Sequence, residues 1–187
     1  GTGVRGSSGD GRPATEAPIT EPYALAFDPG GALLISDDAR VRKVDRSGII
    51  STVAGGGAAY GNDGSPARSV QVVWAQGVVA DRSGNVYFTS SRDQRVRRVD
   101  PAGLVTTVAG APPDAASNGP PAFARTVSPR DLAFDPAGNL YWVEELPQQV
   151  RKMSAIGGLV ILSEGNSFLN GIALDPSGNV YVSDGGD

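Results

Sequence analysis

A nine-residue phrase that occurs four times constrains the fold of this chain more than any other feature of its sequence. The copies read DPGGALLIS, DRSGNVYFT, DPAGNLYWV and DPSGNVYVS, and they begin at Asp28, Asp81, Asp135 and Asp175. They are separated by roughly 40 to 55 residues, and self-similarity at such a period indicates an architecture of stacked repeats. Since a catalytic loop is rarely needed four times in a short chain, the repetition favours a structural role for the phrase.

The residues around each copy predict a four-stranded meander. A short apolar strand precedes each phrase and a second strand follows its glycine, as ALAF and ALLIS do around Asp28. In three copies a third strand comes next, beginning at Arg40, Arg95 and Gln149, and a fourth strand such as IISTV closes the unit. Short β-branched strands joined by tight turns, at about 50 residues a unit, indicate propeller blades and an all-β fold. The expected antiparallel blades span residues 9–55, 61–110, 117–165 and 166–187, the last of them incomplete.

The acid that opens each phrase is predicted to turn the chain. An Asp in the first position and a Gly in the fourth match a type I turn, in which the carboxylate accepts a hydrogen bond from a later backbone N–H and the glycine adopts a positive φ. A calcium loop would need several oxygen ligands over about twelve residues, whereas strand geometry resumes here after about four. The loop acids Asp10 and Asp63, each beside a glycine, are interpreted as turn formers too.

The residue types that the chain lacks exclude much catalytic and metal chemistry. The sequence holds no histidine and no cysteine, which removes the usual general base, imidazole and thiolate ligands, and disulfides. Twenty acidic residues against sixteen basic ones give a net charge of −4, which disfavours nucleic acid as a partner. The longest aliphatic run, Leu159 to Leu162, is far below the roughly 20 residues that cross a bilayer. We therefore expect no catalytic residue, no metal, no cofactor and no membrane insertion in this segment.

Two longer stretches carry a family resemblance. GDGRPATEAPITEPYALAFD and GNVYFTSSRDQRVRRVDPAGLVTTVAG resemble NHL repeats, in the bacterial variety whose blades are joined by a GDG-PA loop. Further loop copies stand at Asp63 and, degraded, at Asn118. The usual acid at the end of the family's second strand is matched at two places and replaced at two others; these positions are Asp37 and Asp184, and Ser90 and Glu144. The resemblance implies a β-propeller, and residues 1–187 are expected to form one partial domain of about three and a half blades, from a propeller of about six.

Propeller topology defines a candidate binding surface. The start of the first strand, the end of the second and the long connectors lie on one face of a blade, which we call the loop-bearing face, and the Asp hairpins lie opposite. Polar residues on loops held by a rigid scaffold are where binding usually resides. The candidate binding residues on the loop-bearing face are Tyr23, Asp37, Trp74, Gln76, Arg130, Glu144, Glu145, Asn170 and Asp184.

Several polar and aromatic residues also have a structural interpretation. Trp74 could pack under a loop instead of binding a partner. Arg130 could form an ordinary salt bridge with the two glutamates Glu144 and Glu145. The arginines that recur once per blade are expected to be structural or solvated; they are Arg42, Arg97 and Arg151.

Apolar side chains on the innermost strands suggest self-association. Leu25 and Phe27 lie on one face of the first such strand, with counterparts in the later repeats at Val78, Leu132, Phe134, Ile172 and Leu174. A terminal blade without a neighbour would expose such a face, so association through exposed blade faces is expected.

Two classes of function remain open. The first is a non-catalytic binding or scaffold module that recognises a protein or a small ligand. Similar NHL domains are sensor or adhesion modules in bacterial receptor kinases and teneurin-like proteins, so the resemblance implies a larger, extracytoplasmic bacterial parent. The second is a propeller enzyme of the lactonase or lyase type with a central Ca²⁺ site.

The sequence offers few ligands for such a calcium site and few cations for RNA. Asn170, Glu144 and Asp131 would supply oxygen ligands, while Ala24 and Gly77, in the same column as Asp131, carry none. Single-stranded RNA, which some animal NHL proteins bind, requires a basic face, and the excess of acidic residues argues against that function.

Overall fold

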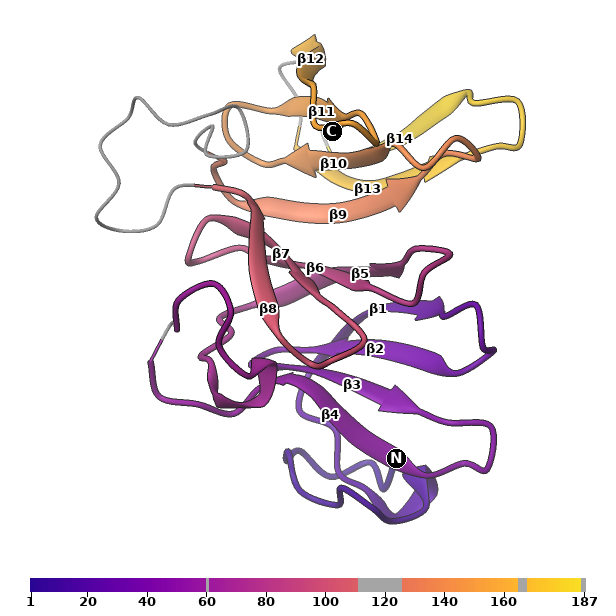
Figure 1. Cartoon of the computed structure of the whole chain (residues 1–187), viewed down its shortest axis with the longest axis vertical. Coiled ribbons are helices and arrows are strands. Elements are labelled where there is room, and N and C mark those ends of the chain that lie inside the picture. The colour runs from indigo at the N-terminus through magenta and orange to yellow at the C-terminus, as the bar shows by residue number, and fades with distance from the viewer. Residues whose placement is uncertain (60, 111–125, 165–167, 186–187) are drawn as a thin grey trace. The chain divides into compact units, whose positions relative to one another are not determined.

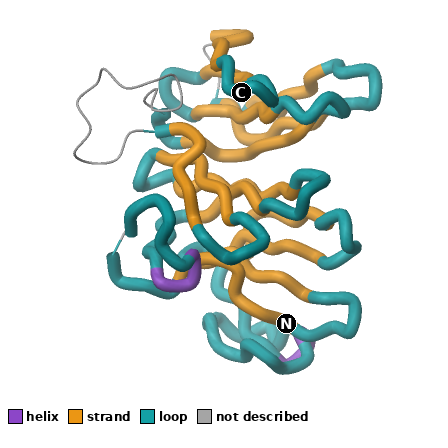
Figure 2. The backbone as a smooth tube through the Cα atoms, in the orientation of Figure 1, coloured by secondary structure: helices purple, strands orange, loops and turns teal. Residues whose placement is uncertain are grey.

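The computed structural model describes residues 1–59, 61–110, 126–164 and 168–185, and strands and loops make up almost all of them (Figure 2). Two 3-10 turns are the helical elements of this part of the chain, η1 (Ala14–Glu16) and η2 (Ala67–Ser69). The strands are β1 (Pro22–Phe27), β2 (Leu33–Asp37), β3 (Arg40–Val44), β4 (Ile50–Gly55), β5 (Ala75–Ala80), β6 (Val86–Ser90), β7 (Arg95–Val99), β8 (Val105–Ala109), β9 (Pro129–Phe134), β10 (Leu140–Glu144), β11 (Gln149–Met153), β12 (Leu159–Glu164), β13 (Leu169–Leu174) and β14 (Val180–Asp184). The all-β prediction is confirmed.

The strands form four sheets that each follow chain order (Figure 1). β1 to β4, β5 to β8 and β9 to β12 make three four-stranded sheets, and β13 pairs with β14. Neighbouring strands of the first, third and fourth sheets are antiparallel. The described strands therefore make the predicted three and a half blades. The loop copy at Asn118 lies outside the described residues.

The acid of the repeated phrase shapes the hairpin that it opens. In all four copies its Oδ1 accepts a hydrogen bond of 2.9 Å from the backbone N–H four residues later, which belongs to Ala32, Asn85, Asn139 or Asn179. The glycine in the fourth position has a φ of 80–85° in every copy. These bonds confirm the turn interpretation.

The second oxygen of the same acid is also used within the blade. In three copies it accepts hydrogen bonds from the asparagine side chain at 2.6–2.7 Å and from a tyrosine hydroxyl at 3.1–3.2 Å. In the first copy, which has Ala32 and Leu34 in these places, the Nζ of Lys43 lies 2.6 Å from Asp28 Oδ2. The phrase acids therefore hold the hairpins together.

Packing of blade on blade forms the core of each of the two compact units into which the chain divides. One unit comprises residues 1–88 with 98–106, and the other comprises 89–97 with 107–187. In the first unit Leu34 of β2 belongs to a buried cluster with Val78 and Phe88 of the second blade. In the second unit Tyr141 of β10 packs with Ile172 of β13.

A polar contact between successive blades accompanies this packing. Ser36 Oγ donates to the backbone carbonyl of Gln76 at 2.6 Å, and at the equivalent position Thr89 Oγ1 donates to the carbonyl of Arg130 at 2.7 Å. The third blade has a valine there, and Asp131 provides a different link, because its Oδ2 accepts from the backbone N–H of Ile172 at 3.0 Å. Burial raises the pKa of Asp131 above its ordinary value. These bonds fix the register of neighbouring inner strands.

Candidate functional site

The arginine that recurs in the third strand of each blade is buried rather than offered to a ligand. Arg42, Arg97 and Arg151 expose 0%, 0% and 9% of their surface. Of the two roles left open for these arginines, the structural one therefore holds.

The connector acid Asp10 bonds the first of these arginines. Asp10 Oδ1 lies 2.9 Å from Arg42 Nη2, and the Asp10 carboxylate accepts hydrogen bonds from the Thr52 backbone N–H at 3.0 Å and the Thr52 hydroxyl at 3.1 Å. Asp10 lies in a turn, as predicted, in which the Arg12 backbone N–H donates to the Gly9 carbonyl at 3.1 Å. Its carboxylate has the further role of tying the N-terminal connector to β3 and β4.

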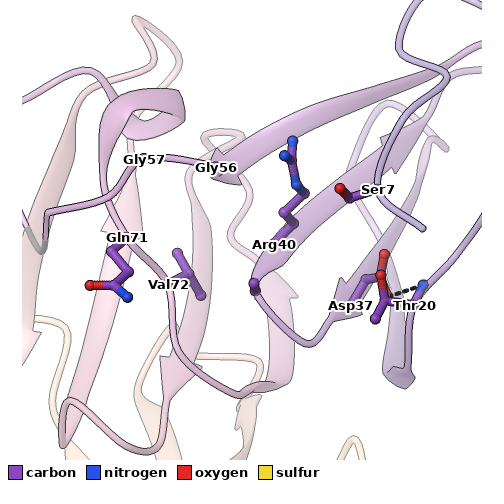
Figure 3. A pocket seen from close by; sticks show the side chains of 9 residues that line it. Ser7, Thr20, Asp37, Arg40, Gly56, Gly57, Gln71 and Val72 are labelled. Atoms are coloured by element: carbon purple, nitrogen blue, oxygen red, sulfur yellow. Dashed lines mark hydrogen bonds between the residues drawn. The ribbon is translucent and has the colours of Figure 1, made fainter. Parts of the chain in front are cut away.

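A hollow of about 290 Å³ lies at the loop-bearing end of the first blade (Figure 3). The end of β2, the start of β3, the glycines after β4 and both connectors line it, through Ser7, Thr20, Asp37, Ala39, Arg40, Gly56, Gly57, Gln71 and Val72. In Figure 3 the side chains of Gln71 and Val72 lie on one side and those of Ser7 and Asp37 on the other, with Arg40 between them. We call this hollow the Asp37 pocket.

Asp37 brings an incompletely satisfied carboxylate to this pocket. Its side chain is almost fully buried, with 1% of the residue exposed, and Oδ1 accepts hydrogen bonds from the backbone N–H groups of Thr20 and Glu21, each at 2.8 Å. Oδ2 has no hydrogen-bond partner in the described part of the protein. A buried acceptor left without a donor costs about 1–3 kcal/mol. Asp37 therefore contributes to the lining of the pocket a carboxylate with one oxygen bonded to the backbone and the other without a described partner.

Arg40 supplies the opposite charge. It pairs with Asp37 across the two-residue turn between β2 and β3, it is half-buried, and its Nη1 lies 3.4 Å from Thr52 Oγ1. The candidate residues predicted from the sequence did not include Arg40, Gln71, Ser7 or Thr20. The register of the hairpin was the available signal for Arg40, because a two-residue turn after Asp37 places Arg40 opposite it.

Two predicted aromatic residues are exposed in the same unit. Tyr23 exposes 45% of its surface, and its hydroxyl donates to Glu21 Oε2 at 2.9 Å. Trp74 is 39% exposed and has a φ of 57°, which is costly for a bulky residue. The backbone N–H of Ala75 donates to the carbonyl of Asp38 at 2.7 Å. This bond holds the strained connector beside the turn that follows Asp37. Gln76 is half-buried.

The predicted charged set of the third blade divides into two separate pairs. Arg130 Nη2 lies 2.7 Å from Glu145 Oε1, and both side chains are partly exposed. Glu144 is fully buried, and its carboxylate accepts from Trp142 Nε1 at 3.0 Å and Gln149 Nε2 at 2.8 Å. Arg151 Nε lies 3.1 Å from Glu144, and burial raises the pKa of Glu144. The structure therefore gives Glu144 a role inside the blade.

The last two predicted residues belong to the fourth blade. Asn170 and Asp184 are exposed and lie at the same end of the β13–β14 pair, where Leu169 faces Asp184. Their role as binding residues, like that of the loop-bearing set as a whole, stays a prediction.

Asp93, in the turn between β6 and β7, makes stability depend on pH. Burial raises the pKa of its carboxyl to about 6. A hydrogen bond with Ser90 and the charges of Arg97 and Arg95 act in the opposite direction and lower this pKa, but by less than burial raises it. Because Asp93 ionises near pH 3.8 in the unfolded chain, the folded state loses stability as the pH rises from about 4 to about 6 and then loses no more. We expect Asp93→Asn to raise the free energy of unfolding by about 2 kcal/mol at about pH 7.5 and to leave it unchanged at about pH 3.5.

Urea unfolding of the Asp93→Asn variant and the unmodified protein at both pH values measures this difference. The same difference at both pH values would contradict the assignment of a raised pKa to Asp93.

Among the described residues, the helical elements are too short to cross a membrane. Within the same ranges, no group of three or more acidic, histidine or cysteine side chains is arranged to hold a metal ion.

The sequence is similar to teneurins. Residues 4–60 match a family model described as the teneurin NHL domain. Teneurin-m of Drosophila melanogaster is 26% identical over 162 residues, which are 80% of this chain and 6% of that protein. Teneurin-3 of Danio rerio is 49% identical over 47 residues, which are 25% of this chain and 2% of the relative. The chain therefore spans only a small part of these relatives.

The backbone of this chain is similar to those of solved propeller structures. A gluconolactonase from Xanthomonas campestris gives a TM-score of 0.68 at 16% identity, over 89% of this chain and 55% of the other. A streptogramin B lyase gives a TM-score of 0.64 at 14% identity, over 90% of this chain and 50% of the other. The chain spans about half the length of these proteins, and at such identities the likeness shows the fold alone.

Proposed function

Since the chain is built of NHL repeats with a β-propeller fold, we propose that it is a non-catalytic recognition module that binds a partner at the loop-bearing end of its first blade. The observation that carries this proposal is the Asp37 pocket, in which a buried carboxylate oxygen has no hydrogen-bond partner among the described residues. The half-buried Arg40 lines the same pocket. Both are side chains on a rigid hairpin, which is the usual setting of a binding site.

The size and chemistry of the pocket favour a protein partner. Its volume of about 290 Å³ is at the lower limit for small-molecule sites, so one side chain fills it better than a whole cofactor. Asp37 Oδ2 would accept a hydrogen bond from a guanidinium or ammonium group, and Arg40 would bind a nearby carbonyl or carboxylate. The exposed rings of Tyr23 and Trp74 add the amphipathic surface that is typical of protein interfaces.

An NMR titration with N-acetyl-arginine amide tests the pocket directly. We expect chemical-shift changes at Thr20, Asp37 and Gln71, and at least a tenfold weaker effect for the Asp37→Asn variant, because an asparagine amide presents a donor where Oδ2 accepts. Asn still offers an oxygen to the N–H groups of Thr20 and Glu21, so the variant is expected to fold.

Asp38→Asn is the matched control for this titration. It removes the same charge from the neighbouring residue, which does not line the pocket. Equal responses of the Asp37→Asn variant and the unmodified protein, or shifts elsewhere only, would contradict the proposal.

Two of the three residues that a lactonase-type calcium site would recruit, Asp131 and Glu144, have other bonds. Asp131 Oδ2 accepts from the Ile172 backbone, its Oδ1 accepts from the Leu132 backbone, and the Glu144 carboxylate bonds Trp142 and Gln149. The likeness to a gluconolactonase concerns the fold alone. We therefore do not propose an enzymatic activity.

The setting of the module is part of the same proposal. Its resemblance to NHL sensor and adhesion domains supports a larger bacterial parent protein that carries it outside the cytoplasm. Fractionation of cells that express the parent protein tests this, and recovery of the module in the cytoplasmic fraction would refute it.

A further inference from the structure

Arg40 brings to the Asp37 pocket a positive charge that no carboxylate of the described chain neutralises. The residue is half-buried, its Nη1 lies 3.4 Å from Thr52 Oγ1, and it forms no ion pair within the described ranges. Asp37 lies opposite Arg40 in the hairpin, yet its Oδ1 is bonded to the backbone N–H groups of Thr20 and Glu21 instead. A half-buried guanidinium without a carboxylate favours an anionic ligand.

The glycine that follows β4 seats this guanidinium at the wall of the pocket. A Cβ added to Gly56 would lie 3.2 Å from Arg40 Cζ and Nη1, so the guanidinium lies against backbone that carries no side chain. Gly56 has a φ of 102°, which L-residues rarely adopt. In Figure 3 the Arg40 side chain extends between Gly56 and Ser7 and does not turn toward Asp37. The two opposite charges that line the pocket are therefore held apart.

Both later complete blades place a carboxylate of their own beside the counterpart of Arg40. In the second blade the counterpart is Arg95, which begins β7. Burial raises the pKa of Asp93, and the charge of Arg95 acts on that pKa in the opposite direction, so the two groups lie within electrostatic reach. In the third blade the counterpart is Gln149, which donates to Glu144 at 2.8 Å.

Turn length explains why the first blade lacks the carboxylate that the second blade has. The turn between the second and third strands comprises residues 91–94 in the second blade, and Asp93 is the third of its four residues. In the first blade the same turn comprises Asp38 and Ala39 alone. This shorter turn has no counterpart of Asp93, so the anion beside Arg40 has to come from a ligand.

The volume of the pocket limits how its two charges can be met. About 290 Å³ fits one residue of a partner, so that residue has to offer a cation to Asp37 and an anion to Arg40. In a protein, a residue at either end of the chain can carry both charges. A basic residue at the carboxyl end has a side-chain cation and an α-carboxylate, and an acidic residue at the amino end has an α-ammonium and a side-chain carboxylate.

Burial distinguishes these two chain ends. Asp37 is 1% exposed and Arg40 is half-buried, so the cation has to reach deeper than the anion. The long, narrow side chain of arginine or lysine carries its charge away from the backbone, whereas an α-ammonium would draw the backbone itself into the pocket. A basic residue at the carboxyl end therefore fits the order of the charges.

We propose that the partner inserts a C-terminal arginine or lysine into the Asp37 pocket, with its side-chain cation on Asp37 Oδ2 and its α-carboxylate on Arg40. This inference rests on the proposed function, since it names the partner group for the same pocket. A guanidinium binds a carboxylate through two parallel N–H groups, and such charged bonds are stronger than bonds to a neutral carbonyl. Arg40 would therefore distinguish a chain end from an internal residue.

NMR titrations that compare N-acetyl-arginine with N-acetyl-arginine amide test the role of the chain end. The acid has an α-carboxylate where the amide has a neutral group. We expect the acid to bind the unmodified protein about tenfold more tightly than the amide, with chemical-shift changes at Gly56 as well as Asp37. Arg40→Gln should remove this preference and leave both probes with the affinity of the amide.

Matched variants separate a specific contact from a change in net charge. Arg46→Gln removes the same charge from an exposed arginine in the turn between β3 and β4, and it should keep the preference for the acid. Arg40→Lys keeps the charge and should keep part of the preference. Circular dichroism checks that the variants fold. The comparison of acid and amide on the unmodified protein needs no variant, so it decides the question even if Arg40→Gln does not fold.

Two further probes distinguish other sources of the same charges. Free arginine carries an α-ammonium where a protein chain would continue, and binding about tenfold tighter than that of N-acetyl-arginine would overturn the assignment to a chain end in favour of a free amino acid. Glutamic acid amide presents the charges of an acidic amino end, and tighter binding of this probe would reverse the assigned chain end. Weaker or equal binding of both probes supports the proposal.

Failure of this inference differs from failure of the proposed function. Equal affinities of the acid and the amide for the unmodified protein would show that the pocket binds a basic side chain without recognising the chain end, which overturns the inference alone. If neither probe changes the signals of Thr20, Asp37 and Gln71, the proposed function is contradicted as well.

Discussion

Replacing Asp10 with alanine is expected to lower the free energy of unfolding by about 1–2 kcal/mol, because it leaves a fully buried guanidinium with one partner fewer, while solvent partly screens the Asp10 side chain, which is 42% exposed. Arg42 is completely buried, and its Nη2 bonds Asp10 at 2.9 Å and the carbonyl of Ser8 at 3.2 Å. Its Nε and Nη1 have no hydrogen-bond partner in the described ranges. Without Asp10 the guanidinium would keep its charge in a buried site with a single carbonyl, and Thr52 would lose its acceptor. Urea unfolding measures the change.

Two further variants separate the buried charge from other effects of the Asp10 substitution. Glu16→Ala removes one exposed acid from the same connector and should change the free energy of unfolding by less than about 0.5 kcal/mol. Arg42→Met added to Asp10→Ala removes the unpaired charge and should recover part of the loss. A double variant that is less stable than Asp10→Ala by the full cost of Arg42→Met alone would show that the two residues are not coupled.

Replacing Gly55 with alanine is expected to cost about 3 kcal/mol or more, through a clash and an unfavourable backbone conformation together. Gly55 has a φ of 93°, and a Cβ at this position would overlap the carbonyl oxygen of Ala39. Gly55 pairs directly with Arg40, so backbone movement here would also displace a side chain that lines the Asp37 pocket. A positive φ costs an L-residue about 1–2 kcal/mol, and overpacking typically adds about 1–3 kcal/mol. Urea unfolding measures the loss of stability.

Gly48→Ala is the control that separates the steric clash at Gly55 from the cost of the positive φ, which both glycines share. Gly48 has a φ of 83° and nothing within 4 Å of an added Cβ, so its substitution should cost only about 1–2 kcal/mol. If both alanine variants are equally stable, steric exclusion at Gly55 is not the cause of the larger effect.

The candidate site was only partly predictable. Strand order in a meander placed Asp37 and the connector before β5 on one face, and both line the Asp37 pocket. Glu144 occupies the position in the third blade that Asp37 has in the first, yet its oxygens are bonded by Trp142 and Gln149. The difference arises from which side chains lie across the hairpin. Gln149 donates to Glu144 from the position that Arg40 occupies opposite Asp37.

The sequence by itself determined the repeat, the hairpins and the all-β fold, because turn chemistry and alternation of apolar residues act between residues that are close in the chain. Asp135 accepts a hydrogen bond from the backbone N–H of Asn139, only four residues away. The local pattern DPAGN is therefore almost sufficient to predict that bond. Tertiary structure decided which polar groups are satisfied and which apolar faces are covered. Asp10 meets Arg42 across 32 residues, and Leu25 is exposed while Val78 is buried, although the local sequences are alike. These outcomes depend on distant segments that supply a hydrogen-bond partner or exclude water, and a local pattern contains no information about either.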